Sequence, residues 1–299
     1  MFIVNHRKIF FTFSSILIIG SIVAMFLFGF NIGIDFKGGS LLEVSFANRP
    51  SVDAVKAELN TQNLGDYTLT PSGSNDYILK TRQLSPAEKT QIESALSSDP
   101  NNPATEVSFD SIGPSVGAQL ESKALTAIIV VIICIVLFIT FAFRKVSYPV
   151  ASWKYGLSTI IALAHDCIIP TGVFLVWIHF RGGQVDLLFV TALLAILGYS
   201  VHDTIVVFDR VREHLRVNQT VKTKETFAET VGKSVTETFG RSINTSFTIF
   251  LALLALYFIG GASTKDFAFV LLIGIITGTY SSIFIASPLL VTLESWQKK

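Results

Sequence analysis

The sequence predicts a multi-span α-helical membrane protein with six transmembrane helices and one small α+β domain of ferredoxin-like order. The composition is 50% hydrophobic and only 15% charged, with a mean hydropathy of +0.56, which exceeds the usual values for soluble domains. Six apolar stretches reach or approach the roughly 20 residues that a helix needs to cross a bilayer. A segment of mixed pattern, 31–123, separates the first stretch from the other five.

The first predicted span is the apolar run Ile9–Phe30, which follows Arg7 and Lys8. It is longer than a signal-peptide core and has no convincing small-residue cleavage site, so we expect it to stay in the protein. The chain then divides into residues 1–30, the domain 31–123 and a five-span membrane domain, 124–299. The later spans are predicted at Ala124–Phe143, Tyr155–Phe180, Leu187–Phe208, Ile243–Ile259 and Phe267–Leu290.

The basic residues predict that both termini are cytoplasmic. In this orientation the two short outer loops carry only Arg181 and Lys265, whereas the inner segments carry 14 basic residues, as the positive-inside rule requires. Residues 31–123 are then extracytoplasmic, and the charged loop 209–240 is cytoplasmic, either a solvated helix pair or a docking site. The 14 are Arg7, Lys8, Arg144, Lys145, Lys154, Arg210, Arg212, Arg216, Lys222, Lys224, Lys233, Arg241, Lys298 and Lys299.

Short alternating runs between Pro, Gly, Ser and Asn clusters predict the extracytoplasmic domain. A Ser cap opens the first helix, and Ser85 followed by Pro86 opens the second. The resulting order, β-α-β-β-α-β, is that of a ferredoxin-like sandwich. Its elements are Ser40–Phe46, Ser51–Asn60, Tyr67–Thr70, Asp76–Thr81, Ser85–Ser97 and Thr105–Asp110.

Ionisable residues inside spans are candidate functional groups, because each costs about 2.5 to 3.5 kcal/mol on insertion scales. His165 and Asp166 lie near the middle of the third span, and His202 and Asp203 lie towards the cytoplasmic end of the fourth. Helical neighbours point about 100° apart, so we expect neither His-Asp pair to be a preformed hydrogen-bonded unit.

Two interpretations of Asp166 stay open, because Pro170 removes the amide that would bond the Asp166 carbonyl. The carboxyl either helps to repair this break or takes part in proton transfer. For Asp203 the sequence favours proton transfer, since no proline explains it and Arg241 begins the next span at a similar depth. The alternatives are a fixed Asp203–Arg241 ion pair that locks two helices, or a positive-inside anchor at Arg241. Asn244, beside Arg241, is a candidate hydrogen-bonding group between helices.

Small residues suggest two further features. Gly274, Gly278 and Ser282 recur every four residues in the sixth span and form a stripe on which another helix packs closely. Gly38 and Gly39 predict a φ-permissive hinge between the first span and the extracytoplasmic domain.

Signatures of enzymes are missing from the sequence. There is no His-Glu-x-x-His motif and no Walker lysine loop, and neither aspartate lies in the Gly-x-Gly-Asp frame of an intramembrane protease. Cys134 and Cys167 lie inside apolar runs, so no disulfide or metal site is expected. The net charge of +1 does not indicate a nucleic-acid partner. We therefore expect no catalytic residues, no metal and no cofactor.

Four segments resemble the SecF family: residues 33–40 (GIDFKGGS), 198–213 (GYSVHDTIVVFDRVRE), 241–246 (RSINTS) and 278–290 (GTYSSIFIASPLL). The first also fits the partner subunit SecD, but the short chain and its single small outer domain favour SecF. One departure is His202, where the family pattern has Asn before the aspartate. This leaves open whether His202 joins the proton path.

The resemblance implies an accessory subunit of the Sec preprotein translocase in the bacterial cytoplasmic (inner) membrane. It would pair with SecD as two six-span halves similar to resistance-nodulation-division transporters, and use the proton gradient to promote export. Implied partners are SecD, the SecYEG channel, the translocating preprotein and YajC. The candidate proton-relay residues are Asp203, Arg241, Asp166, His202 and Asn244, with the part of His202 left open. The alternative is half of a proton-coupled lipid or small-molecule transporter, and a structural membrane scaffold ranks third.

Overall fold

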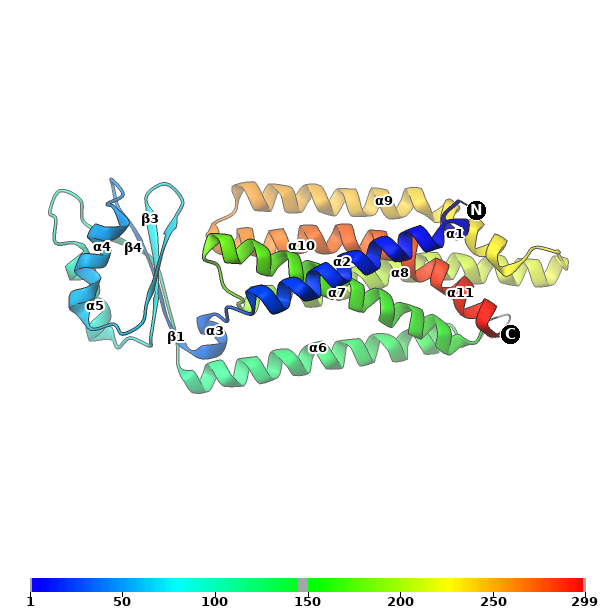
Figure 1. Ribbon diagram of the computed structural model, residues 1–299, viewed down its shortest axis with the longest axis horizontal. Helices are drawn as coiled ribbons and strands as arrows, with labels where there is room; N and C mark the ends of the chain where they lie inside the picture. Colours follow the sequence, from blue (N-terminus) through cyan, green and yellow to red (C-terminus); the bar gives the residue numbers. More distant parts are fainter. Residues whose placement is uncertain (1, 145–149, 298–299) are drawn as a thin grey trace. The chain divides into compact units, whose positions relative to one another are not determined.

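The computed structural model describes residues 2–144 and 150–297, which form two compact units (Figure 1). The membrane unit comprises Met1–Gly29, Ala127–Arg181 and Leu188–Lys299, and the outer unit comprises Phe30–Thr126 with Gly182–Leu187. Three of the basic residues counted for orientation, Lys145, Lys298 and Lys299, lie outside the described residues.

Six helical stretches in the described residues are long and apolar enough to cross a membrane, which confirms the predicted number of spans. All of them except the first are longer than the predicted apolar runs, because their polar ends continue the same hydrogen-bonded backbone. Thr226, for example, opens α9 with a capping box that includes Glu229. The stretches are α2 (Arg7–Phe28), α6 (Pro114–Ala142), α7 (Ser152–Arg181), α8 (Leu187–Val221), α9 (Phe227–Ile259) and Thr264–Trp296.

The sixth stretch contains a change of helical pitch that the sequence did not predict. α10 (Ala262–Ser281) runs into a π-helical turn, Ser282–Ala286, before α11 (Ser287–Gln297). Ser287 Oγ donates to the Ser282 carbonyl at 3.0 Å inside this turn. π-turns within α-helices are frequent at functional sites, because they change which side chains face a neighbouring helix.

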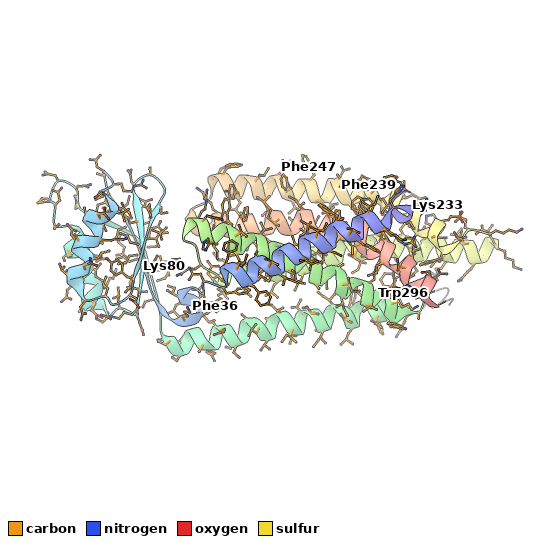
Figure 2. The ribbon with its side chains drawn as sticks, in the orientation of Figure 1. Phe36, Lys80, Lys233, Phe239, Phe247 and Trp296 are labelled. Carbon is orange, nitrogen blue, oxygen red and sulfur yellow. The ribbon has the colours of Figure 1, made fainter. Side chains whose placement is uncertain are left out.

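Within the membrane unit α7, α8 and α10 are the buried helices, whereas α2, α6 and α9 leave most of their surface exposed. Phe239 and Phe247 on α9 belong to this exposed surface (Figure 2). A short helix, α1 (Phe2–Asn5), precedes α2. Figure 1 shows both ends of the chain and the α8–α9 hairpin at the same end of the helical unit, as an even number of spans requires.

The outer unit contains a four-stranded antiparallel sheet in the order β2-β3-β1-β4, which confirms the predicted ferredoxin-like order. Inward side chains of the sheet, such as Leu42 and Leu79, pack on the two helices through Leu59 and Ile92. Ser51 and Ser85 cap these helices as predicted. The elements are β1 (Gly39–Ser45), α4 (Val52–Leu59), a 3₁₀ turn (Asn60–Gln62), β2 (Thr68–Ser72), β3 (Asp76–Thr81), α5 (Pro86–Leu96) and β4 (Thr105–Ile112).

The loop between α7 and α8 also belongs to the outer unit. Val185 donates its N–H to the Asn31 carbonyl at 2.7 Å, and Gly33 donates to the Val185 carbonyl at 2.8 Å. Asp35, in the short helix α3 (Ile34–Lys37), accepts a hydrogen bond from the amide of Leu187 at 2.7 Å. Since Leu187 is the first residue of α8, this carboxylate satisfies a free N–H at the helix N-terminus.

Candidate functional site

Asp166 is the centre of a buried polar cluster that joins three helices. It lies on α7 with no exposed surface. Its Oδ2 accepts hydrogen bonds from Ser281 Oγ on α10, at 2.6 Å, and from Ser200 Oγ on α8. Its Oδ1 is bonded to His165 Nδ1 at 2.8 Å. With these three partners neither oxygen of the Asp166 carboxyl lacks a hydrogen bond.

The bond between His165 and Asp166 contradicts the expectation that these neighbours form no hydrogen-bonded unit. The 100° separation applies at Cβ, whereas rotation about the side-chain bonds of both residues brings Nδ1 back towards Oδ1. The hydrogen bonds of the Asp166 carboxyl in the described residues go to His165, Ser200 and Ser281, not to the backbone near Pro170.

Asp203 forms a second buried centre, between α8 and α9. Its side chain is 5% exposed. Ser242 Oγ donates to its Oδ1 at 2.6 Å, while Oδ2 has no hydrogen-bond partner in the described part of the chain. An unsatisfied carboxyl oxygen in a buried site is costly, and it leaves one position at which a proton or a new donor can bind.

Hydroxyl groups connect the surroundings of the two aspartates. Ser200, which donates to Asp166, accepts a hydrogen bond at its carbonyl from Ser282 Oγ at 3.3 Å. Ser282 Oγ is in turn 2.8 Å from Thr204 Oγ1, on the residue that follows Asp203. These hydrogen bonds connect Asp166 to the stretch of α8 that precedes and follows Asp203, but none of them reaches the Asp203 carboxyl, whose partner is Ser242.

A further group of hydroxyls lies between α9 and the neighbouring helices. Ser246 is 2.6 Å from Thr279 on α10 and 2.5 Å from the hydroxyl of Tyr199 on α8. Ser246 Oγ also donates to the carbonyl of Ser242, the residue bonded to Asp203. Serine and threonine on spans commonly bond across helices in this way. Ser200, Ser242 and Ser281 lie in the segments 198–213, 241–246 and 278–290 singled out in the sequence, but nothing there indicated which side chains they would bond.

The other predicted relay residues lie on the surface of the chain. Arg241, His202 and Asn244 are exposed, and among the described residues no ion pair joins Arg241 to Asp203. Arg241 and His202 are nevertheless close enough to act electrostatically on the Asp203 carboxyl. His202 makes no recorded hydrogen bond with Asp203 in the described residues. Ser242 occupies the position beside the carboxyl that the sequence suggested for Arg241.

The small-residue stripe of α10 lies against α8. A Cβ atom at Gly274 would be 2.2 Å from Ile196, and one at Gly278 would be 3.2 Å from the Cβ of Ser200 and 3.7 Å from Asp166 Oδ2. Ser282 continues the stripe by bonding Thr204. The absence of a side chain at Gly278 therefore leaves room for the Ser200–Asp166 hydrogen bond.

Replacing Gly278 with Val should destabilise the purified protein by about 1 to 3 kcal/mol, because the added methyl groups overpack the contact with α8. Gly198→Val is the matched control, since a Cβ at Gly198 meets nothing within 4 Å. The measurement is detergent-induced unfolding of both variants and the wild type. Equal stability of the Gly278 and Gly198 variants would show that the stripe is not a close-packed contact.

The two predicted hinge glycines adopt backbone conformations that other residues rarely adopt. Gly38 has φ 78° and Gly39 has φ 144°. A Cβ at Gly38 would be 2.7 Å from the Cα of Pro114, and one at Gly39 would be 2.6 Å from the Thr81 carbonyl oxygen. Gly117 packs on the same turn, since its Cβ would be 2.7 Å from the Phe36 carbonyl oxygen. Glycine is therefore required at this turn for both conformation and space.

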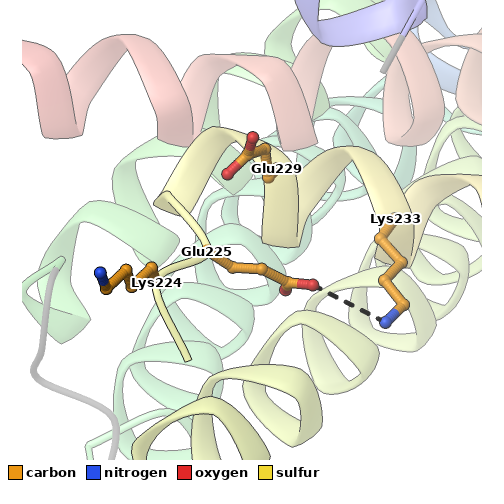
Figure 3. Close-up of a pocket in the computed structure, with 4 residues that line it drawn as sticks. All are labelled: Lys224, Glu225, Glu229 and Lys233. Atoms are coloured by element: carbon orange, nitrogen blue, oxygen red, sulfur yellow. Dashed lines mark ion pairs between the residues drawn. The ribbon is translucent and has the colours of Figure 1, made fainter. Parts of the chain in front are cut away.

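The charged cleft at the α8–α9 hairpin is explained by local structure (Figure 3). Glu229 caps α9 through Thr226, and Glu225 is 3.9 Å from Lys233 and bonded to Asn218. The described residues contain no group of three or more His, Cys, Asp or Glu side chains that could hold a metal ion. The membrane unit also buries Lys154 and Glu294, but Asp166 and Asp203 are the buried carboxyl groups that the sequence placed inside the spans.

Two family models match the chain. The model described as the C-terminal part of the protein export membrane proteins SecD/SecF matches residues 92–296, and the SecD/SecF GG motif matches residues 23–48. The second match includes Gly38 and Gly39. The first covers more than half of the chain.

Similar proteins include protein translocase subunits SecF from Thermobaculum terrenum and Anaerolinea thermophila. The first is 40% identical, with the match covering 99% of this chain and 94% of that protein. The second is 38% identical, covering 98% and 94%. Among solved structures, SecDF of Thermus thermophilus, a translocon-associated membrane protein, is 30% identical with a TM-score of 0.82. The match covers 99% of this chain but 38% of the SecDF chain.

Proposed function

Because the chain belongs to the SecD/SecF family, and within it to the SecF subunits, we propose that it couples the proton gradient to preprotein export. The family places it as an accessory subunit of the Sec translocase and a multi-pass protein of the bacterial inner membrane. Its proposed partners are SecD, the SecYEG channel, the translocating preprotein and YajC. No substrate is chemically changed.

The observation that carries the proton-coupling proposal is the incompletely bonded carboxyl of Asp203. A buried carboxyl with one free oxygen accepts a proton without disturbing the Ser242 hydrogen bond. Burial disfavours the charged form of a carboxyl group and a nearby guanidinium favours it. A change in the distance between Arg241 and Asp203 would therefore load a proton in one conformation and release it in another.

The exposed polar groups around Asp203 suggest where SecD binds. His202, Arg241 and Asn244 are exposed on α8 and α9, and contact of such groups with lipid is unfavourable. A neighbouring protein helix would cover them, so we place the SecD contact on this surface. Proton transfer would then take place next to the subunit interface, with His202, Asn244 and Asp166 as further members of the path.

Force on the preprotein would come from movement of the outer unit. The strap Asn31–Asp35 is hydrogen-bonded to the loop that leads into α8, the helix of Asp203. In the proposal, a movement of α8 is passed along the chain to this loop and, through its hydrogen bonds, to the segment that enters β1 through Gly38 and Gly39. A second solved SecDF structure, described as a super-membrane-facing form, is consistent with more than one arrangement in that protein. We keep the hinge at Gly38 and Gly39 as part of the proposal.

Copurification with SecD and SecYEG tests the assignment of partners. Affinity purification of the full chain from mildly solubilised membranes should recover both in stoichiometric amounts. The rival function, half of a proton-coupled lipid or small-molecule transporter, predicts instead proton-coupled efflux and normal secretion when the chain is removed. Recovery of neither partner, together with normal secretion, would contradict the proposal.

The proposed orientation places both termini in the cytoplasm, and cysteine labelling tests it. In a chain with Cys134 and Cys167 replaced by Ala, a cysteine at Ser74 should react with an impermeant thiol reagent added outside intact cells. A cysteine at Thr223 should react only after the cytoplasmic side is opened. Both positions are exposed in their units, so accessibility depends on the side of the membrane. The reverse pattern would overturn the orientation.

A further inference from the structure

A histidine that the proposed function does not use lies beside the Asp166 cluster. His165 is 1% exposed. Its Nδ1 is bonded to Asp166 Oδ1 at 2.8 Å, while Nε2 has no hydrogen-bond partner in the described residues. With Asp166 ionised, the neutral ring carries its proton on Nδ1 and donates it to the carboxylate, so Nε2 is left with a free lone pair.

Two further polar side chains lie near the ring of His165. Its ring stacks on Tyr280 of α10, with centroids 6.0 Å apart. The Tyr280 hydroxyl donates to the Phe10 carbonyl of α2 at 3.1 Å, and Ser14 of α2 lies near it. Ser14 Oγ is buried as well and lies within reach of the Tyr280 hydroxyl. The free Nε2 of His165, together with the Tyr280 and Ser14 hydroxyls, supplies the two to four polar partners that a buried water molecule needs.

We propose that His165 is a second proton-binding site of the chain, which takes up a proton at Nε2 through water held at the junction of α2, α7 and α10. This inference rests on the proposed proton coupling and adds a site distinct from Asp203. Uptake forms one Nε2–H bond and breaks one O–H bond of a protonated water, and release reverses the step. The Nδ1–H bond to Asp166 is kept throughout.

The electrostatic surroundings suit an imidazolium at this position. In the described part of the chain the titratable side chains recorded in contact with His165 are Asp166, on its own helix, and Tyr280, on α10. The polar side chains that α2 and α8 place nearby, Ser14 and Ser200, carry no charge. An imidazolium next to an ionised Asp166 is a neutral pair overall, and such pairing is what makes buried charge tolerable.

Protonation of His165 would affect helix packing through the hydrogen bonds that Asp166 makes with α8 and α10. Asp166 holds Ser200 of α8 and Ser281 of α10, and Ser281 directly precedes the π-turn. When His165 becomes charged, Asp166 oxygens are drawn more strongly to the imidazolium and less to these hydroxyls. Protonation at His165 thereby changes how tightly α7 holds α8 and α10.

Nitrogen NMR of the full chain, labelled with ¹⁵N-histidine and reconstituted in lipid nanodiscs, tests the proposal. His165 is one of five histidines, and its signals are identified by their loss in His165→Gln. Between about pH 5 and pH 9, a range centred near the ordinary titration of histidine, they should change from a singly to a doubly protonated ring. In Asp166→Asn the doubly protonated form should be lost. A ring that stays neutral over the whole range in the wild type would overturn the proposal.

Two further variants separate this inference from the proposed function. Asp203→Asn should leave the His165 titration unchanged. Proton binding at His165 is therefore tested separately from proton binding at Asp203. His165→Gln should lower the stimulation of preprotein export by the proton gradient several-fold, while the variant still assembles normally with SecD. His179→Gln, at an exposed position of the same helix, should retain the full stimulation of export by the gradient. Full stimulation in His165→Gln would contradict a role for this proton in export.

Discussion

Asp203→Asn should abolish the stimulation of preprotein export by the proton gradient while leaving expression and assembly with SecD intact. Asparagine keeps the size of the side chain and still accepts the hydrogen bond from Ser242, but it cannot bind and release a proton. One proton moved through 100 mV supplies about 2.3 kcal/mol, so its loss removes about a fifty-fold bias between two conformations. The measurement is gradient-dependent export into inverted membrane vesicles.

Asp209→Asn is the matched control for this experiment. Asp209 lies on the same helix but is exposed and pairs with Arg212, so its replacement should leave export near normal. Arg241→Met should reproduce the loss seen with Asp203→Asn, because the positive charge of Arg241 is needed for Asp203 to release its proton. If Asp203 and Arg241 merely lock two helices together, the asparagine could still hydrogen-bond Arg241, and export should stay near normal. A normally assembled and fully active Asp203→Asn protein would therefore eliminate the relay.

Replacing both Gly38 and Gly39 with Val should nearly abolish export without preventing membrane insertion. Each non-glycine residue held in such a backbone conformation costs about 1 to 3 kcal/mol. The new side chains would also collide with the Pro114 and Thr81 backbones. The turn between α3 and β1 would distort. Movement of the strap Asn31–Asp35 would then no longer be passed on to the sheet.

Gly20→Val provides the control for the double variant, because Gly20 lies in α2, has ordinary helical φ and would place its Cβ in open space. Insertion is measured by protease accessibility of the outer unit, and export by pulse-chase of a secreted protein. Normal export by the Gly38→Val, Gly39→Val protein would show that the glycines are only a convenient exit from the membrane.

The sequence was sufficient to predict the elements whose signals are local. Apolar runs of 17 or more residues marked the spans, because a helix needs about that length to cross a bilayer. Ser51 and Ser85 marked two helix starts, and Ser85 does so through a capping box with Glu88. The alternation of apolar and polar residues in 76–81 predicted a strand with the same bounds as β3 in the structure.

Contacts between distant segments were not predictable from the same patterns. The bonds of Asp166 to Ser200 and Ser281 join residues 34 and 115 positions apart, and a serine in a span carries no signal of its partner. The pairing of residues 182–187 with the strap Asn31–Asp35 was missed for the same reason. The His165–Asp166 bond was missed because a helical-wheel argument ignores side-chain rotation.

The central claim, that the chain uses the proton gradient in export, is tested most directly by removing the gradient. Inverted vesicles with and without the chain are compared for the rate of preprotein export, before and after a protonophore collapses the gradient at constant ATP. The account predicts that the chain stimulates export only while the gradient is present. Equal stimulation after the collapse would contradict it.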